Sequence, residues 1–212
     1  MAASNVTSAP VSAILQKLYS APDAVACAEA ATDLANFVNS HGIRSLEEAE
    51  ISADLIRASK NMKSGFEREG AMVAMEELFR RVGANMGAEP YFLPFLPYIL
   101  DKYAEQGKAE VVRDAAVKAG KQLVYLPPQE YAPKFIGPLF DAMEQPSVKW
   151  KTKVGALELL ATFPSRAKSV VADRLGEYIP RLEVQMRDTK ADVSETPCIA
   201  MPFFTYADFF TS

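Results

Sequence analysis

Three proline-containing segments decide the fold: LPYIL at residues 96–100, GPLF at 137–140 and IPRL at 179–182. In each segment the proline stands among apolar residues of a helical stretch, and successive prolines are 41 and 42 residues apart. A repeat length near 40 is typical of HEAT and armadillo proteins, in which helix pairs stack into a solenoid. The spacing therefore predicts a tolerated proline kink at one place in successive repeats, which bends the first helix of each pair around the stack.

The rest of the chain favours helices over strands. Runs of alternating apolar and polar residues are missing from the sequence, whereas Ala, Leu, Glu, Lys and Met are abundant. The segments SLEE at 45–48 and SGFE at 64–67 match the capping box that opens a helix. These signals predict an all-α, HEAT/armadillo-like α-solenoid of about four to five helix pairs. The expected helices cover residues 8–19 and 22–40, 45–61 and 64–86, 90–105 and 108–125, 128–143 and 146–162, and 164–187.

Composition places the chain among globular proteins. Of its 212 residues 49% are apolar and 24% charged, and its mean hydropathy is -0.03. The longest apolar stretch, at 91–100, is well short of the roughly 20 residues that span a bilayer. Residues 1–10 lack the positive flank and apolar run of a secretory signal, and two distant cysteines, Cys27 and Cys198, form no disulfide framework or metal-binding pair. We therefore expect a cytoplasmic protein without a membrane partner.

Charge is distributed unevenly along the chain. The net charge of -4 argues against a nucleic-acid binder that works by bulk charge, and DNA is not an expected partner. Between residues 149 and 190, however, nine Lys and Arg stand against five Asp and Glu, a local charge of +4. This asymmetry can steer the basic end toward an anionic surface such as structured RNA. The alternative is an ordinary solvated helix face.

Four segments resemble one known family. They are EPYFLPFLP at 89–97, KWKTKV at 149–154, EYIP at 177–180 and RDTKADV at 187–193. In sequence and order they are similar to the N-terminal HEAT region of fungal translation elongation factor 3. The resemblance is good over 89–193 and looser over 14–86. It implies a HEAT solenoid from a family that also carries a four-helix bundle and two ATP-binding cassettes of the ABC-F type, and that assists elongation and release of spent tRNA on the ribosome.

The sequence departs from that family after residue 193. The second helix of a fifth pair is expected there, but Pro197 and Pro202 oppose a helix. Five aromatic residues follow without helical phase: Phe203, Phe204, Tyr206, Phe209 and Phe210. We therefore expect a partial HEAT solenoid over 1–193 and an irregular, non-repeat tail over 194–212, as in a truncated product. A native segment that plugs the open end of the solenoid with aromatic side chains is the alternative.

No catalytic, cofactor-binding or metal site is predicted. A phosphate-binding loop of the form G-x-x-x-x-G-K-[ST] does not occur in this sequence, so the ATPase half that the resemblance implies is missing from it. The single histidine, His41, is interpreted as a residue at a helix C-terminus, where a positive charge is favourable. The acidic clusters at 47–50 and 76–77 have no nearby His or Cys and are interpreted as solvated helix faces.

The leading hypothesis is a non-catalytic module that binds the ribosome, both rRNA and ribosomal proteins, and acts in translation elongation, as the resemblance implies. Trp150 either stacks on a base or packs against the neighbouring repeat. Two alternatives stay open: a general protein scaffold or adaptor that uses the concave face of the solenoid, and a truncated product without independent function. The candidate contact residues line one edge of the basic region: Lys149, Lys151, Lys153, Arg187 and Lys190.

Overall fold

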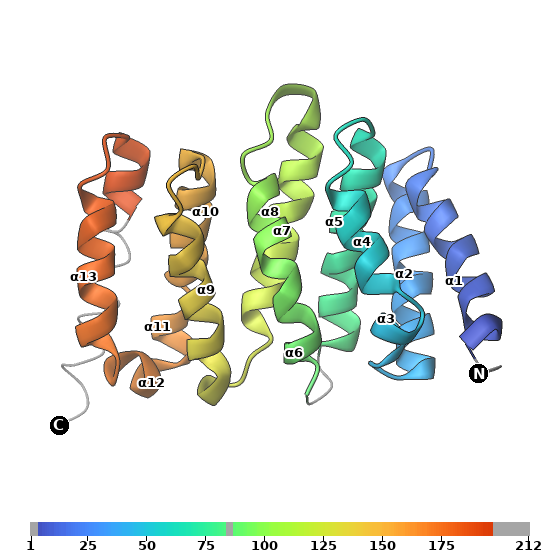
Figure 1. Cartoon of the computed structure of the whole chain (residues 1–212), viewed down its shortest axis with the longest axis horizontal. Helices are drawn as coiled ribbons and strands as arrows, with labels where there is room; N and C mark the ends of the chain where they lie inside the picture. Colours follow the sequence, from blue (N-terminus) through green and yellow to red (C-terminus); the bar gives the residue numbers. More distant parts are fainter. Residues whose placement is uncertain (1–3, 84–86, 197–212) are drawn as a thin grey trace. The chain divides into compact units, whose positions relative to one another are not determined.

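The computed structural model describes residues 4–83 and 87–196, so the aromatic residues expected in the tail lie outside the described residues (Figure 1). Every regular element within the described ranges is a helix. The chain divides into two compact units, Met1–Leu126 and Pro127–Ser212, and each is described by itself. In the part of the chain that the structure describes, none of the helices is long and apolar enough to cross a membrane.

The first unit consists of three helix pairs. The first pair is α1 (Ser4–Tyr19) with α2 (Ala24–His41). In the second, α3 (Ser45–Glu48) and α4 (Ile51–Ser59) precede α5 (Gly65–Val82); in the third, α6 (Glu89–Phe92), η1 (Leu93–Phe95) and α7 (Leu96–Lys102) precede η2 (Gly107–Ala109) and α8 (Glu110–Tyr125). The second helices of successive pairs pack on one another, α2 against α5 and α5 against α8. This stacking buries the apolar face that a single pair leaves open.

The apolar stripe of α5 forms the centre of this unit. Its members recur every three or four residues and are buried: Met72, Met75, Leu78, Phe79 and Val82. The ring of Phe79 contacts Phe92 edge-on at 5.0 Å and lies 6.0 Å from Phe95, measured between ring centroids. The third pair is therefore anchored to the second through aromatic contacts.

The second unit begins with η3 (Gln129–Tyr131), α9 (Ala132–Glu144) and α10 (Trp150–Leu160). Three helices follow, α11 (Phe163–Arg166), α12 (Lys168–Ala172) and α13 (Leu175–Met186). The rings of Phe140 on α9 and Tyr178 on α13 stack at 5.5 Å. Residues 191–196 are also helical, so the second helix of the fifth pair begins within the described residues and includes positions 194–196, which the sequence analysis assigned to the tail.

The three repeat prolines occupy two kinds of position. Pro138 and Pro180 lie inside α9 and α13, as predicted. Pro97 is instead the second residue of α7, because η1 interrupts the continuous helix expected at 90–105. A first-turn amide has no intrahelical partner, so a proline costs little there. The prediction of a kink inside this helix was therefore wrong for Pro97.

Of the two predicted caps, one forms. Ser64 Oγ accepts a hydrogen bond from the Glu67 N–H at 3.1 Å, as expected of an N-cap. The Glu67 carboxylate does not complete the box, since it accepts from Asn61 Nδ2 at 2.9 Å. The prediction for Ser45 was wrong, because its hydroxyl donates to the Gly42 carbonyl oxygen at 2.7 Å and caps nothing.

Candidate functional site

The first turn of α10 concentrates positive charge. Lys149 is its N-cap residue, and its carbonyl oxygen accepts the N–H groups of Thr152 at 3.0 Å and Lys153 at 3.2 Å. Lys151 and Lys153 follow within the same turn, which contains no acidic residue. Cations oppose the dipole at a helix N-terminus, where Asp or Glu is usually favoured. Local helix stability therefore gives no reason for these lysines.

An ion pair joins this turn to the segment after α13. Lys153 Nζ lies 2.6 Å from Asp188 Oδ2, and the two side chains are only 21% and 15% exposed. The other carboxylate oxygen of Asp188 accepts the Lys190 N–H at 2.9 Å. The Lys153 ammonium and the Lys190 amide together lower the pKa of Asp188, so this carboxylate is ionised at neutral pH.

The ion pair brings the two predicted basic segments together. Lys149 lies one turn before Lys153 in α10, while Arg187 and Lys190 flank Asp188. We call the five predicted cations the basic edge: Lys149, Lys151, Lys153, Arg187 and Lys190. Within residues 4–83 and 87–196, ion pairing engages Lys153 alone of these five. The other four cations therefore form no ion pair with a described carboxylate, although the Lys190 charge also lies close enough to Asp188 to lower its pKa.

Exposure and local role differ among these four cations. Lys149, Arg187 and Lys190 are exposed, and Lys151 is half-buried. The Lys151 ammonium lies 5.5 Å from the centre of the Trp150 ring, within the range of a cation–π contact. Arg187 follows the last turn of α13, where its charge favours the helix dipole. Among the lysines at the start of α10, Lys149 is thus the one that the described contacts explain least.

Trp150 is half-buried, which is intermediate between the two interpretations of its role. Part of its ring is covered within the second unit, and part is accessible to a ligand.

Asp188 was not recognised as a site residue from the sequence. Sequence reasoning could have considered an Asx turn, in which an Asp side chain accepts the N–H of the residue two positions later, as Asp188 does from Lys190. The pairing of Asp188 with Lys153 could not be expected from a local pattern, because the two residues are 35 positions apart.

A second charged cluster in this unit has a structural role. Arg181 on α13 donates two hydrogen bonds to the Glu144 carboxylate, each 2.7 Å, and one to Asp141 at 2.8 Å. Its guanidinium also lies 4.5 Å from the centre of the Phe140 ring. These hydrogen bonds connect α13 to α9. Because the two acids offset the charge of Arg181, this residue does not add to the basic edge.

The remaining candidate residues have structural explanations. His41 is the last residue of α2, as predicted, and its ring stacks on Phe37 with centroids 4.0 Å apart. Glu77 was expected on a solvated face, but it is half-buried. It accepts hydrogen bonds from Thr32 Oγ1 at 3.1 Å, from Arg80 and from Arg81. Among the described residues, no group of three His, Cys, Asp or Glu side chains is arranged to hold a metal ion.

Helix pairs whose second members stack on one another define the class of this protein as an α-solenoid of the HEAT and armadillo type. Comparison with known proteins then identifies the family. The family model described as EF3 N-terminal HEAT repeat matches residues 27–201, and the chain belongs to this family. The resemblance read from the four segments is therefore confirmed.

Relatives of the chain are much longer proteins. The mRNA export factor elf1 of Schizosaccharomyces pombe is 35% identical over 190 residues, which are 89% of this chain and 18% of elf1. Elongation factor 3 of Gonapodya prolifera is 34% identical over 164 residues, 77% of this chain and 15% of the relative. The stalled ribosome sensor GCN1 of Mus musculus is 30% identical over 166 residues, 78% of this chain and 6% of GCN1. The chain thus corresponds to a small part of each relative.

Proposed function

We propose that this chain is a non-catalytic docking module that binds the ribosome through the basic edge and acts in translation elongation. One observation carries the proposal. Lys149 and Lys151 stand at the N-terminus of α10 without an acid in the first turn, and the Lys153–Asp188 ion pair holds Arg187 and Lys190 beside them. Because this arrangement opposes the helix dipole, a ligand with negative charge explains it better than the fold does.

The partner with suitable chemistry is the phosphate backbone of rRNA. Exposed Lys and Arg side chains donate hydrogen bonds to phosphate oxygens, and binding releases the counterions that the phosphates had condensed. The accessible part of the Trp150 ring can stack on an unpaired base beside those phosphates. Such contacts are insensitive to sequence and strongly sensitive to salt. Acidic segments of ribosomal proteins are the second kind of surface that the basic edge accepts.

The relatives support a role of this kind. One is named an elongation factor and another a stalled ribosome sensor. The region shared with the elongation factors is their N-terminal HEAT repeat, and we infer from this that the chain supplies binding and no catalysis of its own. We accordingly propose that the chain acts in the cytoplasm.

The test is co-sedimentation of the full chain with purified ribosomes. We expect the wild-type chain to pellet with ribosomes at low salt, and a fourfold charge reversal to Glu to abolish pelleting. A matched variant reverses four exposed lysines of the first unit and should pellet normally. The two sets of substituted residues are Lys149, Lys151, Arg187 and Lys190, and Lys17, Lys63, Lys108 and Lys121.

Two results would contradict the proposal. If the variant with the reversed basic edge pellets as well as the wild type does, the basic edge makes no contact with the ribosome. If pelleting persists in high salt and after RNase treatment, the chain binds protein through another face, as the scaffold alternative holds.

A further inference from the structure

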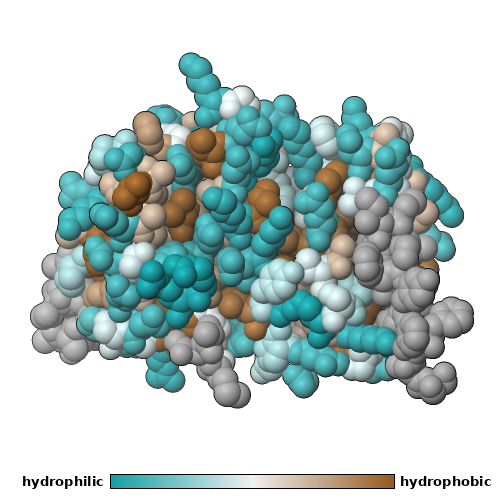
Figure 2. Space-filling model, turned by 180° about the vertical axis from the view of Figure 1, so that it is seen from behind, coloured by the Kyte–Doolittle hydropathy of each residue, from teal (hydrophilic) through white to brown (hydrophobic). Residues whose placement is uncertain are grey.

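Exposed apolar side chains gather at one end of the first unit. The face drawn in Figure 2 is mostly hydrophilic, with small apolar areas between the hydrophilic residues. Three of the most exposed large apolar side chains belong to the loops and helix starts of the first two pairs: Val25 is 68% exposed, Met62 71% and Phe66 71%. Val25 and Phe66 lie in the first turns of α2 and α5.

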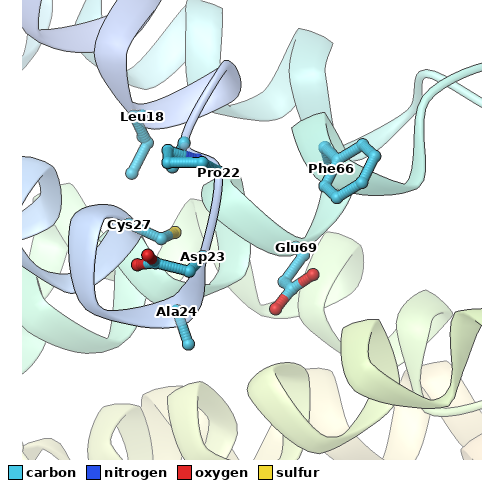
Figure 3. Close-up of a pocket in the computed structure, with 8 residues that line it drawn as sticks. Leu18, Pro22, Asp23, Ala24, Cys27, Phe66 and Glu69 are labelled. Carbon is cyan, nitrogen blue, oxygen red and sulfur yellow. The ribbon is translucent and has the colours of Figure 1, made fainter.

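A pocket separates these two helix starts (Figure 3). Leu18, Pro22 and Ala24 line it on the side of α1 and α2, and Phe66 and Glu69 line it on the side of α5. The buried thiol of Cys27 also lines the pocket. Burial raises the pKa of this thiol to about 11, so it is a neutral part of the wall.

The size of the pocket limits what it can hold. Its volume is about 180 Å³, whereas sites for small-molecule ligands usually measure roughly 300–1,000 Å³. This volume is below the range for drug-sized ligands, and it suits a single aliphatic side chain of a partner. The neighbouring exposed apolar residues would extend such a contact beyond the pocket itself.

The charge of the residues that line the pocket indicates which kind of partner fits it. Asp23 and Glu69 line the pocket together with apolar residues, and none of the lining residues is basic. Asp23 Oδ1 accepts the Ala26 N–H at 2.8 Å as the N-cap of α2. An aliphatic side chain that enters between these two carboxylates is best flanked by Lys or Arg.

The fold itself does not require Phe66. Ser64 already caps α5, and the Phe66 side chain remains largely in water. An exposed phenylalanine at the lip of a pocket gains from burial only when a partner covers it. This position is therefore better explained by a contact with another chain than by folding.

We propose that the pocket between the starts of α2 and α5 docks a basic peptide segment of a partner protein, which inserts one aliphatic side chain flanked by Lys or Arg. This site lies in the first unit and is independent of the basic edge in the second unit. It gives the module a protein contact in addition to the proposed contact with rRNA.

The test measures fluorescence anisotropy of three labelled peptides of equal length with the full chain. The peptides are GSKRLLKRSG, the polar control GSKRSSKRSG and the acidic control GSEELLEESG. We expect the first peptide to bind at least about tenfold more tightly than either control, because only it combines apolar and basic groups. Equal binding of all three, or binding of none, would overturn the proposal.

Variants of the chain locate the site. Phe66→Ser should weaken binding of GSKRLLKRSG about tenfold, whereas Val184→Ser, which removes an exposed apolar side chain from α13 in the second unit, should not change it. Glu69→Lys should weaken this peptide and strengthen the acidic peptide, an exchange of preference that misfolding cannot produce; Glu47→Lys is its matched control. Unchanged binding to both pocket variants would refute the assignment. The chain with a reversed basic edge should bind the peptide normally, so the two proposals fail separately.

Discussion

The ammonium of Lys153 lies 2.6 Å from the carboxylate of Asp188, across 35 positions of sequence. This contact fastens the first turn of α10 to the turn after α13, and it places an acid within a surface that is otherwise basic. Asp188 thus has a positioning role, because it neutralises one lysine and fixes the main chain at Lys190. We therefore expect this pair to contribute to the stability of the second unit and to the arrangement of the basic edge.

Replacing Asp188 by Asn should destabilise the second unit. The ion pair is mostly buried, so its loss should lower the free energy of unfolding by about 1–2 kcal/mol, more than for an exposed pair. Urea unfolding of the full chain measures the effect. The pairing account predicts that Lys153→Met and Asp188→Asn combined cost less than the sum of the two single changes; strict additivity would contradict a direct interaction.

Acid should weaken the same unit through Asp188. Hydrogen bonds from Lys153 and Lys190 lower the pKa of Asp188 in the folded chain below the ordinary value of about 3.9. The stabilisation is therefore complete above the unfolded pKa and is lost as the pH falls through the lower folded pKa. Thermal unfolding followed below pH about 4 should show a steeper loss for the wild type than for Asp188→Asn. The exposed Asp173→Asn variant should follow the wild type.

Lys should not fully replace Arg181 in stabilising the second unit. Its guanidinium binds both oxygens of Glu144, reaches Asp141 and covers the Phe140 ring, and an ammonium cannot do all three. We expect Arg181→Lys to cost about 1 kcal/mol of unfolding free energy. Arg187→Lys is the matched control, because Arg187 is exposed and forms no ion pair with a described carboxylate. Equal effects of the two changes would show that the Arg181 network adds no stability.

The N-cap of α5 gives a prediction for the first unit. Ser64→Ala removes the acceptor of the Glu67 N–H and should lower stability by about 1 kcal/mol. Ser64→Asp retains a cap acceptor and should lose little. Chemical unfolding of both variants measures the difference, and identical losses would argue that the hydroxyl does not act as a cap.

The repeat architecture was largely predictable because it follows from local and periodic signals. Proline spacing and the apolar stripe of α5 indicated helix pairs, and the structure has such pairs, although the helices expected at 45–61, 90–105 and 164–187 are each broken into shorter ones. The position of Pro97 was predicted wrongly because the sequence around it also permits a helix to start there. Pro94 favours a break just before this point, and the spacing of apolar residues does not reveal such a break. Ser45 shows the same limit, since its hydroxyl has a competing acceptor in Gly42 that a four-residue motif cannot reveal.

The candidate site was predictable in composition but not in connectivity. Counting charges located the basic segments at 149–153 and 187–190. The ion pair that joins them depends on tertiary packing between elements about one repeat apart, and no local pattern specifies it. The pocket beside Phe66 likewise combines residues from three helices, so only the folded chain brings them together.

The most direct test of the central claim is the salt dependence of binding to purified ribosomes. Wild-type chain is compared with a variant in which Lys149, Lys151, Arg187 and Lys190 are changed to Gln. Each phosphate contact contributes roughly 0.7–0.9 to the slope of log Kd against log salt. If the basic edge contacts rRNA phosphates, the slope should fall by about 3 and the low-salt affinity should fall with it. An unchanged slope and affinity would contradict the account.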